Sequence, residues 1–215
     1  MSETTTPVKA CRTVVLISGS GSNLQAIIDA QQAGEIPISI KAVISNKDGV
    51  KGLARAQAHN ITTEVLSHKG FESRDAFDSA LKDCIDKYQA ELVVLAGFMR
   101  ILTPGFTTHY LGRMLNIHPS LLPKYQGLHT HQRAIDAGDT EHGVTVHFVT
   151  AELDGGPAVI QAKVPIQQGD TAERLAERVL REEHRIYPLA IGWFARGRLK
   201  MIEGKACLDG EEIRL

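Results

Sequence analysis

Residues 12–30 read RTVVLISGSGSNLQAIIDA and form the first complete structural unit of the chain. The run over residues 12–18 is rich in β-branched side chains, which is typical of a strand covered on both faces. Glycine-rich residues 19–23 follow, and apolar residues then recur at helical spacing over residues 24–30. The order strand, tight turn, helix predicts an open α/β sheet.

The glycine turn suggests a binding site for a phosphate group. Gly21, Ser22 and Asn23 stand where backbone N–H groups and a helix N-terminus would hold an anion. The dinucleotide fingerprint is not met, because Leu24 replaces its third glycine, and the Gly-Lys-Ser/Thr of a Walker loop is missing. A terminal-phosphate site and a plain tight turn both remain open as interpretations.

The rest of the chain continues the alternation of strands and helices. We expect strands over residues 38–45, 61–66 and 92–96, helices over 52–58, 73–88 and 104–110, a hairpin from 143–149 and 158–164, a helix from Thr171 interrupted near Pro188 and resumed through Trp193, and one or two short edge strands within 199–208. The fold class is α/β, a Rossmann-like, mostly parallel twisted sheet with helices on both faces and an antiparallel hairpin at one edge. We expect a flexible tail over residues 1–12 and a single catalytic domain over residues 13–215.

Composition excludes several classes of protein. The chain has 215 residues and a net charge of −1, so no strong field draws it to nucleic acid or a membrane surface. Cys11, Cys84 and Cys207 are odd in number and far apart, which argues against a disulfide framework or a zinc knuckle. Because the first residues lack an apolar signal region and no apolar run approaches about 18 residues, we expect a cytoplasmic protein.

Residues 114–123 read MLNIHPSLLP and carry the most suggestive polar pair. In an apolar strand stopped by Pro119, Asn116 and His118 occupy alternate positions and therefore share one face. An amide NH₂ and an imidazolium N–H held close together can both donate to an oxygen that gains negative charge. The alternative is a strand that ends with two polar residues capping the next loop.

Four other features have a structural and a functional interpretation. Arg74 is either a solvated side chain or a contact for a ligand carboxylate, and residues 98–102 form either core or a ring-binding loop. Asp154 precedes two glycines and is either a turn residue or part of a site. His129 and His131 lie near His118 and suggest a metal site, but no metal-binding pattern supports it.

Four motifs together resemble the phosphoribosylglycinamide formyltransferases, a folate-dependent enzyme family. They are ISGSGSNLQ at residues 17–25, LAGFMR at 95–100, LNIHPSLLP at 115–123 and LDGGP at 153–157. The match runs in order from about residue 13 to residue 210. Gln126 stands where several members of the family have proline in a Lys-Tyr-Pro-Gly turn.

The resemblance implies formyl transfer from 10-formyltetrahydrofolate, as co-substrate and without a metal, to the amine of 5-phosphoribosylglycinamide in purine biosynthesis. It implies the catalytic residues Asn116, His118 and Asp154, and the ribotide-binding residues Gly21, Ser22, Asn23 and Glu183. The implied folate-binding residues are Arg74, Met99, Arg100, Ile101, Leu102, Asn116, Thr150, Ala151, Glu152, Leu153 and Asp154. The expected partners are these two small molecules, with no nucleic acid or membrane, in a monomer or homodimer.

The proposed trio fits what such a reaction demands. Asn116 and His118 would donate to the oxyanion of the tetrahedral intermediate, while Asp154 would favour the protonated imidazole and handle the proton of the amine. Four alternatives remain, one of which is a metal hydrolase that uses His118, His129 and His131. A formyltetrahydrofolate hydrolase should have an extra N-terminal domain, and a methionyl-tRNA formyltransferase an extra basic C-terminal domain. A non-catalytic phosphosugar-binding module would use the same scaffold.

Overall fold

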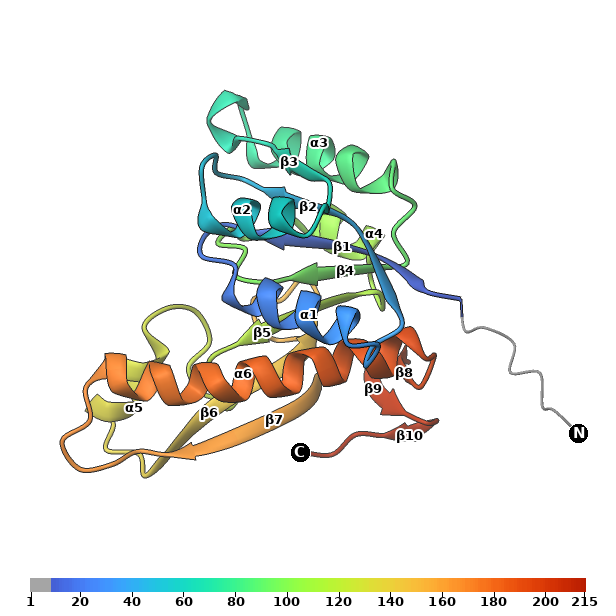
Figure 1. The fold of residues 1–215 in the computed structure, drawn as a ribbon. Helices are drawn as coiled ribbons and strands as arrows, with labels where there is room; N and C mark the ends of the chain where they lie inside the picture. The colour runs from blue at the N-terminus through green and yellow to red at the C-terminus, as the bar shows by residue number, and fades with distance from the viewer. Residues whose placement is uncertain (1–8) are drawn as a thin grey trace, which may run out of the picture.

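The computed structural model describes residues 9–215, and a sheet of seven strands forms its centre (Figure 1). The strands are β1 (Cys11–Ile17), β2 (Ile38–Ser45), β3 (Thr63–Val65), β4 (Leu92–Leu95), β5 (Met114–His118), β6 (Glu141–Phe148) and β7 (Ala158–Pro165). Their order is β3-β2-β1-β4-β5-β6-β7; the first five are parallel, and β6 pairs antiparallel with β5 and β7. The predicted parallel sheet with a hairpin at one edge is confirmed.

Helices cover both faces of this sheet. They are α1 (Ser22–Gln32), α2 (Lys51–Ala58), α3 (Arg74–Asp86), α4 (Pro104–His109), α5 (Thr130–Asp136) and α6 (Ala172–Ala195), with a 3₁₀ turn at His68–Gly70. Alternation along β1 divides the core: Val15 and Ile17 pack with α1, α2 and α6, whereas Val14 and Leu16 pack with α3 and α4. The carboxyl ends of the parallel strands meet at one edge, where ligands of such sheets bind.

Helix α6 is continuous, so the predicted interruption near Pro188 is wrong. Pro188 removes one helical hydrogen bond, which costs about 3 kcal/mol. The same stretch of α6 buries Ile186, Tyr187 and Ile191 completely. Each such side chain contributes about 1.5–3 kcal/mol on burial, so together they outweigh the proline. The Tyr187 hydroxyl also lies 2.7 Å from the carbonyl oxygen of Leu95 and 3.0 Å from that of Leu115, which ties α6 to β4 and β5.

The first and the last strands differ from expectation. Strand β1 begins at Cys11, one residue before the predicted strand; residues 1–8 of the predicted tail lie outside the described residues, and the predicted domain bounds stay a prediction. Near the carboxyl end, β8 (Leu199–Ile202), β9 (Lys205–Leu208) and β10 (Glu211–Glu212) form a separate antiparallel sheet instead of one or two edge strands. The turn between β8 and β9 has positive φ at Glu203 and Gly204, the geometry that favours a tight hairpin.

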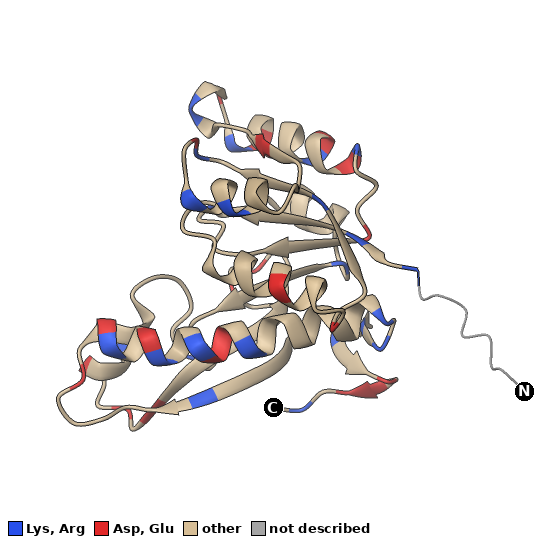
Figure 2. Ribbon diagram, viewed as in Figure 1, with Lys and Arg blue, Asp and Glu red and all other residues tan. Residues whose placement is uncertain are grey.

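Charge is distributed over the outside of the fold. Figure 2 shows acidic and basic residues together along α3 and α6, whereas β4 and β5 have none. No helix within residues 9–215 is long and apolar enough to cross a membrane. Cys11, Cys84 and Cys207 are free thiols.

Candidate active site

Strand β5 ends in the polar pair that the sequence singles out. His118 is only 6% exposed, and its Nε2 lies 2.8 Å from the carbonyl oxygen of Tyr125. Because a carbonyl only accepts, this nitrogen carries a proton and donates. Asn116, two positions earlier on the same face, is partly exposed to the cavities beyond the strand. The interpretation of both residues as loop caps is therefore incomplete, since each borders empty space.

Asp154 approaches His118 from the loop between β6 and β7. One carboxylate oxygen, Oδ2, lies 3.4 Å from His118 Nδ1 and accepts a 2.9 Å hydrogen bond from the Gly127 backbone N–H. The Asp154 backbone has φ 51°, a left-handed conformation that turns the loop. Farther along, Gly156 lies so close to the Phe148 carbonyl that a Cβ would collide with it. Asp154 is thus both a turn residue and a neighbour of the β5 imidazole.

His147 on β6 completes this cluster, and the sequence analysis did not single it out. Its ring is almost fully buried, at 2% exposure. Nε2 lies 3.2 Å from Asn116 Nδ2 and 3.8 Å from Asp154 Oδ1, and Nδ1 lies 2.9 Å from the Phe148 carbonyl. Burial lowers the pKa of His147, which favours the neutral ring. In the sequence, His147 is one position of an alternating strand and gives no separate signal.

Two cavities meet at these side chains. One has a volume of about 600 Å³ and extends past His118 to Asn23 and Glu183. The other, of about 110 Å³, lies between residues 98–102 and the loop over residues 149–154. The residues that line both are Phe98, Arg100, Ile101, Asn116, Leu153 and Asp154. Two of the three predicted catalytic residues therefore lie on the shared wall, and His118 borders the larger cavity.

The glycine turn between β1 and α1 leads into the larger cavity only at Asn23, whereas Gly21 does not line it. Gly21 has φ 71°, and a Cβ there would approach Gly52 Cα to 2.6 Å, so this position needs glycine. Helix α1 begins at the next residue without a side-chain cap, which leaves its first N–H groups available. Arg55 donates from Nε to the Ser20 carbonyl at 2.8 Å and holds the turn from behind.

Asn23 and Glu183 connect this turn to α6. Asn23 Nδ2 donates to Glu183 Oε2 at 2.7 Å, while Asn23 Oδ1 is buried without a hydrogen-bond partner among residues 9–215. Burial raises the pKa of Glu183, although the hydrogen bond from Asn23 opposes this shift. Both residues line the larger cavity, so three segments far apart in sequence enclose one space.

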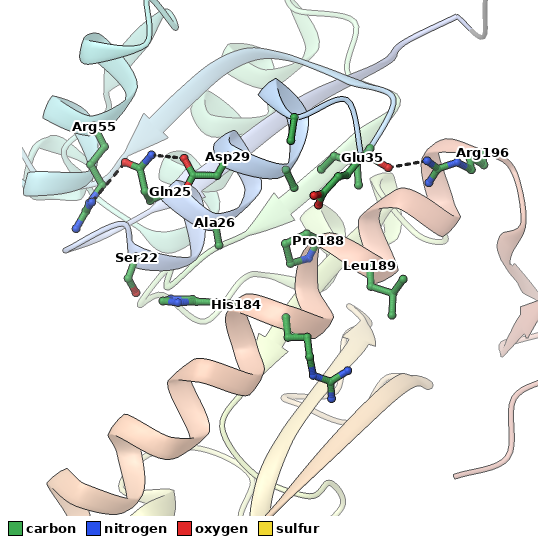
Figure 3. A pocket seen from close by; sticks show the side chains of 14 residues that line it. Ser22, Gln25, Ala26, Asp29, Glu35, Arg55, His184, Pro188, Leu189 and Arg196 are labelled. Atoms are coloured by element: carbon green, nitrogen blue, oxygen red, sulfur yellow. Dashed lines mark hydrogen bonds between the residues drawn. The ribbon is translucent and has the colours of Figure 1, made fainter.

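A third cavity, separate from the larger and the smaller cavity at β5, has a volume of about 830 Å³ and runs along α1 and α6 (Figure 3). Ser22 and His184 face one another at one end, and Pro188 and Leu189 lie farther along α6. The predicted catalytic residues Asn116, His118 and Asp154 do not border this space. Ser22 and Asn23 are consecutive but line different cavities, which places the start of α1 between the two.

The predicted folate-binding residues divide into two groups. Arg100, Ile101 and Leu102, together with residues 150–154, line the smaller cavity, and the exposed Met99 lines the larger one. Arg74 lines neither; its NH2 group donates to the Ile101 carbonyl at 2.8 Å. Arg74 is exposed, as the solvated interpretation expects, and its side chain also supports the loop; its contact with a ligand carboxylate stays a prediction.

The additional histidines form a different arrangement from the suggested metal site. His131 Nδ1 lies 3.1 Å from Nε2 of His142, a residue that the sequence analysis did not consider. Burial lowers the pKa of His142 to about 4 and also lowers that of His131. Across residues 9–215, no three His, Cys, Asp or Glu side chains are grouped so that they could hold a metal ion.

Comparisons with known proteins agree with this architecture. A family model described as formyl transferase matches residues 11–191. The chain is 58% identical over 200 residues to phosphoribosylglycinamide formyltransferase of Escherichia coli (strain K12), with 93% of this chain and 94% of that protein covered. It is 45% identical over 205 residues to the trifunctional purine biosynthetic protein adenosine-3 of Homo sapiens, covering 95% of this chain and 20% of that protein.

Solved structures give the same result in three dimensions. The phosphoribosylglycinamide formyltransferase of Coxiella burnetii, in complex with CHES, matches with a TM-score of 0.92 at 53% identity, covering 95% of this chain and 96% of that one. Glycinamide ribonucleotide transformylase 1 of Symbiobacterium toebii matches with a TM-score of 0.90 at 45% identity, covering 93% and 94%. The chain belongs to the formyl transferase family.

Proposed function

We propose that the protein transfers the formyl group of 10-formyltetrahydrofolate to the amine of 5-phosphoribosylglycinamide, a step of purine biosynthesis. The observation that carries this proposal is the meeting of two cavities at Asn116 and Asp154, with His118 beside them. A reaction between two bound molecules needs such a junction, because alignment of the reactants supplies much of the acceleration. The relatives named phosphoribosylglycinamide formyltransferase support the choice of substrates.

The larger cavity is assigned to the ribotide. Its phosphate would bind the start of α1 at Gly21, Ser22 and Asn23, which no side chain caps, where Asn23 borders this cavity and the helix dipole favours negative charge. The unpartnered Asn23 Oδ1 and the carboxyl of Glu183 are suited to hydroxyl groups of the ribose. The amine would then point toward His118, at the other end of the cavity.

The smaller cavity is assigned to the folate. Its walls supply backbone groups of residues 100–102 and 150–154 for the polar edge of a pterin ring. Met99, Ile101 and Leu153 are 62%, 56% and 49% exposed, and such apolar side chains around an opening suit the aromatic part of a ligand. Arg74 acts here by holding Ile101.

In the proposed reaction, the amine nitrogen attacks the formyl carbon and a tetrahedral oxyanion forms. Asn116 and His118 donate to this oxyanion, and each donor contributes about 10²–10³ in rate. Both ring nitrogens of His118 face oxygens, Tyr125 O and Asp154 Oδ2, an arrangement that suits the imidazolium. The formyl oxygen has to compete with the Tyr125 carbonyl for the Nε2 proton.

The intermediate then collapses, and the bond between the formyl carbon and N10 of the folate breaks. The proton that the amine loses passes to N10, directly through Asp154 or through a water molecule. No covalent enzyme intermediate is required, because the ribotide supplies the nucleophile. We extend the proposal to a cytoplasmic enzyme that acts on these two small molecules as a monomer or homodimer, without a metal.

The absorbance of 10-formyltetrahydrofolate, followed with and without the glycinamide ribotide, tests the proposal. We expect conversion only when both substrates are present, with formylated ribotide formed in equal amount. Equal rates without the ribotide would instead identify a hydrolase. No conversion in either case would identify a non-catalytic binding module.

A further inference from the structure

His147 is held in one place by the sheet itself. In the antiparallel pairing of β5 with β6, it lies directly opposite Asn116, so the two side chains project from neighbouring strands on the same face. The register of β6 with β7 shifts between Val146 and His147, a local irregularity of the kind often found beside functional sites. The imidazole is 2% exposed and borders the smaller cavity.

The contacts of this ring define its tautomer. Nδ1 lies 2.9 Å from the Phe148 carbonyl oxygen, so Nδ1 must carry a proton. In the neutral ring Nε2 then has a lone pair, which accepts a hydrogen bond from Asn116 Nδ2 at 3.2 Å. Both contacts are satisfied by the Nδ1–H form alone.

The tautomer in turn fixes the orientation of the Asn116 carboxamide. If the amide were turned over, its oxygen would face Nε2, and the ring would need a second proton. Burial lowers the pKa of His147 and disfavours such an imidazolium, although Asp154 Oδ1, 3.8 Å from Nε2, opposes this shift. With Nδ2 toward His147, one N–H of the Asn116 amide donates to the imidazole ring. The second N–H stays available beside the cavities.

We propose that His147 is a positioning residue, which holds the Asn116 carboxamide so that its second N–H points at the oxyanion. This role rests on the proposed function, because the oxyanion belongs to that reaction. His147 itself does not touch the reacting atoms. Its effect on turnover passes through Asn116, so removal of Asn116 should abolish the effect.

Two variants separate the hydrogen bond from the bulk of the ring. His147→Phe keeps a ring in the buried space but lacks the acceptor, whereas the Oε1 of His147→Gln reaches the same region and can accept. We expect His147→Phe to lower kcat about 10- to 100-fold with both KM values within about threefold, since misalignment costs up to about 10² in rate. We expect His147→Gln to recover kcat to within about threefold of the parent.

A double-variant cycle supplies the decisive comparison. In an Asn116→Ala background, His147→Phe should change kcat by less than about twofold, because the positioned group is gone. Multiplicative losses, or a His147→Gln variant as slow as His147→Phe, would overturn the proposal. Thermal melting of each variant identifies a loss of turnover that follows from unfolding.

Nuclear magnetic resonance of ¹⁵N-labelled histidine in the parent protein tests the same inference without turnover or substitution. The expected spectrum shows Nδ1 of His147 protonated and Nε2 unprotonated at neutral pH. A proton on Nε2 would overturn the inference even if the enzyme is active. Absence of formyl transfer in the parent would refute the proposed function alone, and the tautomer would still be measured.

Discussion

The trio cluster, which consists of Asn116, His118 and Asp154 with the neighbouring His147, differs from the glycine turn before α1 in the kind of polar group that it presents. At β5 the polar groups are side chains from three segments, buried and hydrogen-bonded to one another, as the contacts of His118 and His147 show. At the turn they are backbone N–H groups that no side chain caps, at a helix start that follows a glycine with φ 71°. Charge that appears during a reaction requires placed side chains, whereas a permanent phosphate charge can be held by backbone.

This difference predicts which kinetic constant each region controls. Changes in the trio cluster should lower kcat, because its donors interact more strongly with the transition state than with the substrate. Changes in the glycine turn should raise the KM for the ribotide and leave kcat at saturation much less affected.

The largest expected effect comes from removal of both oxyanion donors. The Asn116→Ala/His118→Ala variant should lose on the order of 10³–10⁴ in kcat, less than the product of two independent losses because the donors act together. Steady-state formyl transfer measures this loss, and the ribotide KM should stay within about threefold. A raised ribotide KM with normal kcat would break the comparison between the two regions.

Asp154→Asn should have the next largest effect, about 10² in kcat at neutral pH. The amide is neutral and cannot take up the proton that the amine loses, as the carboxylate can. Steady-state formyl transfer at saturating substrates measures this loss. Asp136→Asn on α5 is the matched control, because Asp136 is away from both cavities and bonds only Gln132 in its own helix; a parallel loss in that variant would count against the pairing.

Gly21→Ala should raise the ribotide KM about tenfold or more and change kcat at saturation by less than about threefold. The added Cβ would approach Gly52 Cα to 2.6 Å, so the turn must shift its N–H groups. Gly34→Ala is the control, because Gly34 also has positive φ, 74°, but has nothing within 4 Å of an added Cβ. Equal KM values in the two variants would show that the turn does not hold the phosphate.

The smallest effect concerns Glu183 and the pH dependence of stability. Burial raises the pKa of Glu183 above 4.5, so the native state binds this proton more tightly than the unfolded state. Its ionisation therefore lowers the free energy of unfolding as the pH rises above 4.5. Glu183→Gln removes that ionisation but keeps an acceptor for Asn23, so the variant should gain stability relative to the parent toward neutral pH. Thermal unfolding of both proteins across a pH series measures this gain. A stability difference between the variant and the parent that stayed constant or decreased toward neutral pH would contradict the prediction.

The main fold could be predicted from the sequence, but two features could not. The apolar runs within residues 12–18 and 92–95 are local, and they predict both strands and their burial. The continuity of α6 through Pro188 depends on burial against strands far away in sequence. The β8–β9–β10 sheet depends on pairing that no local pattern specifies.

The candidate site, like the fold, could be predicted only in part from the sequence. Asn116 and His118 are two positions apart on one strand, so their shared face is readable directly. Asp154 is joined to them only by the fold, and from the residues alone it remained a turn candidate. His147 was missed because its partner Asn116 is set by the register of β5 with β6, which a single sequence does not reveal.

The most direct test of the trio cluster is the His118→Ala variant, with turnover and substrate binding measured on the same protein. Isothermal titration should give dissociation constants for the ribotide and for a non-reactive folate analogue within about threefold of the parent. Single-turnover formyl transfer should be slower by about 10²-fold or more. A transfer rate within about threefold of the parent would contradict the assignment of His118 and, with it, the account of this site.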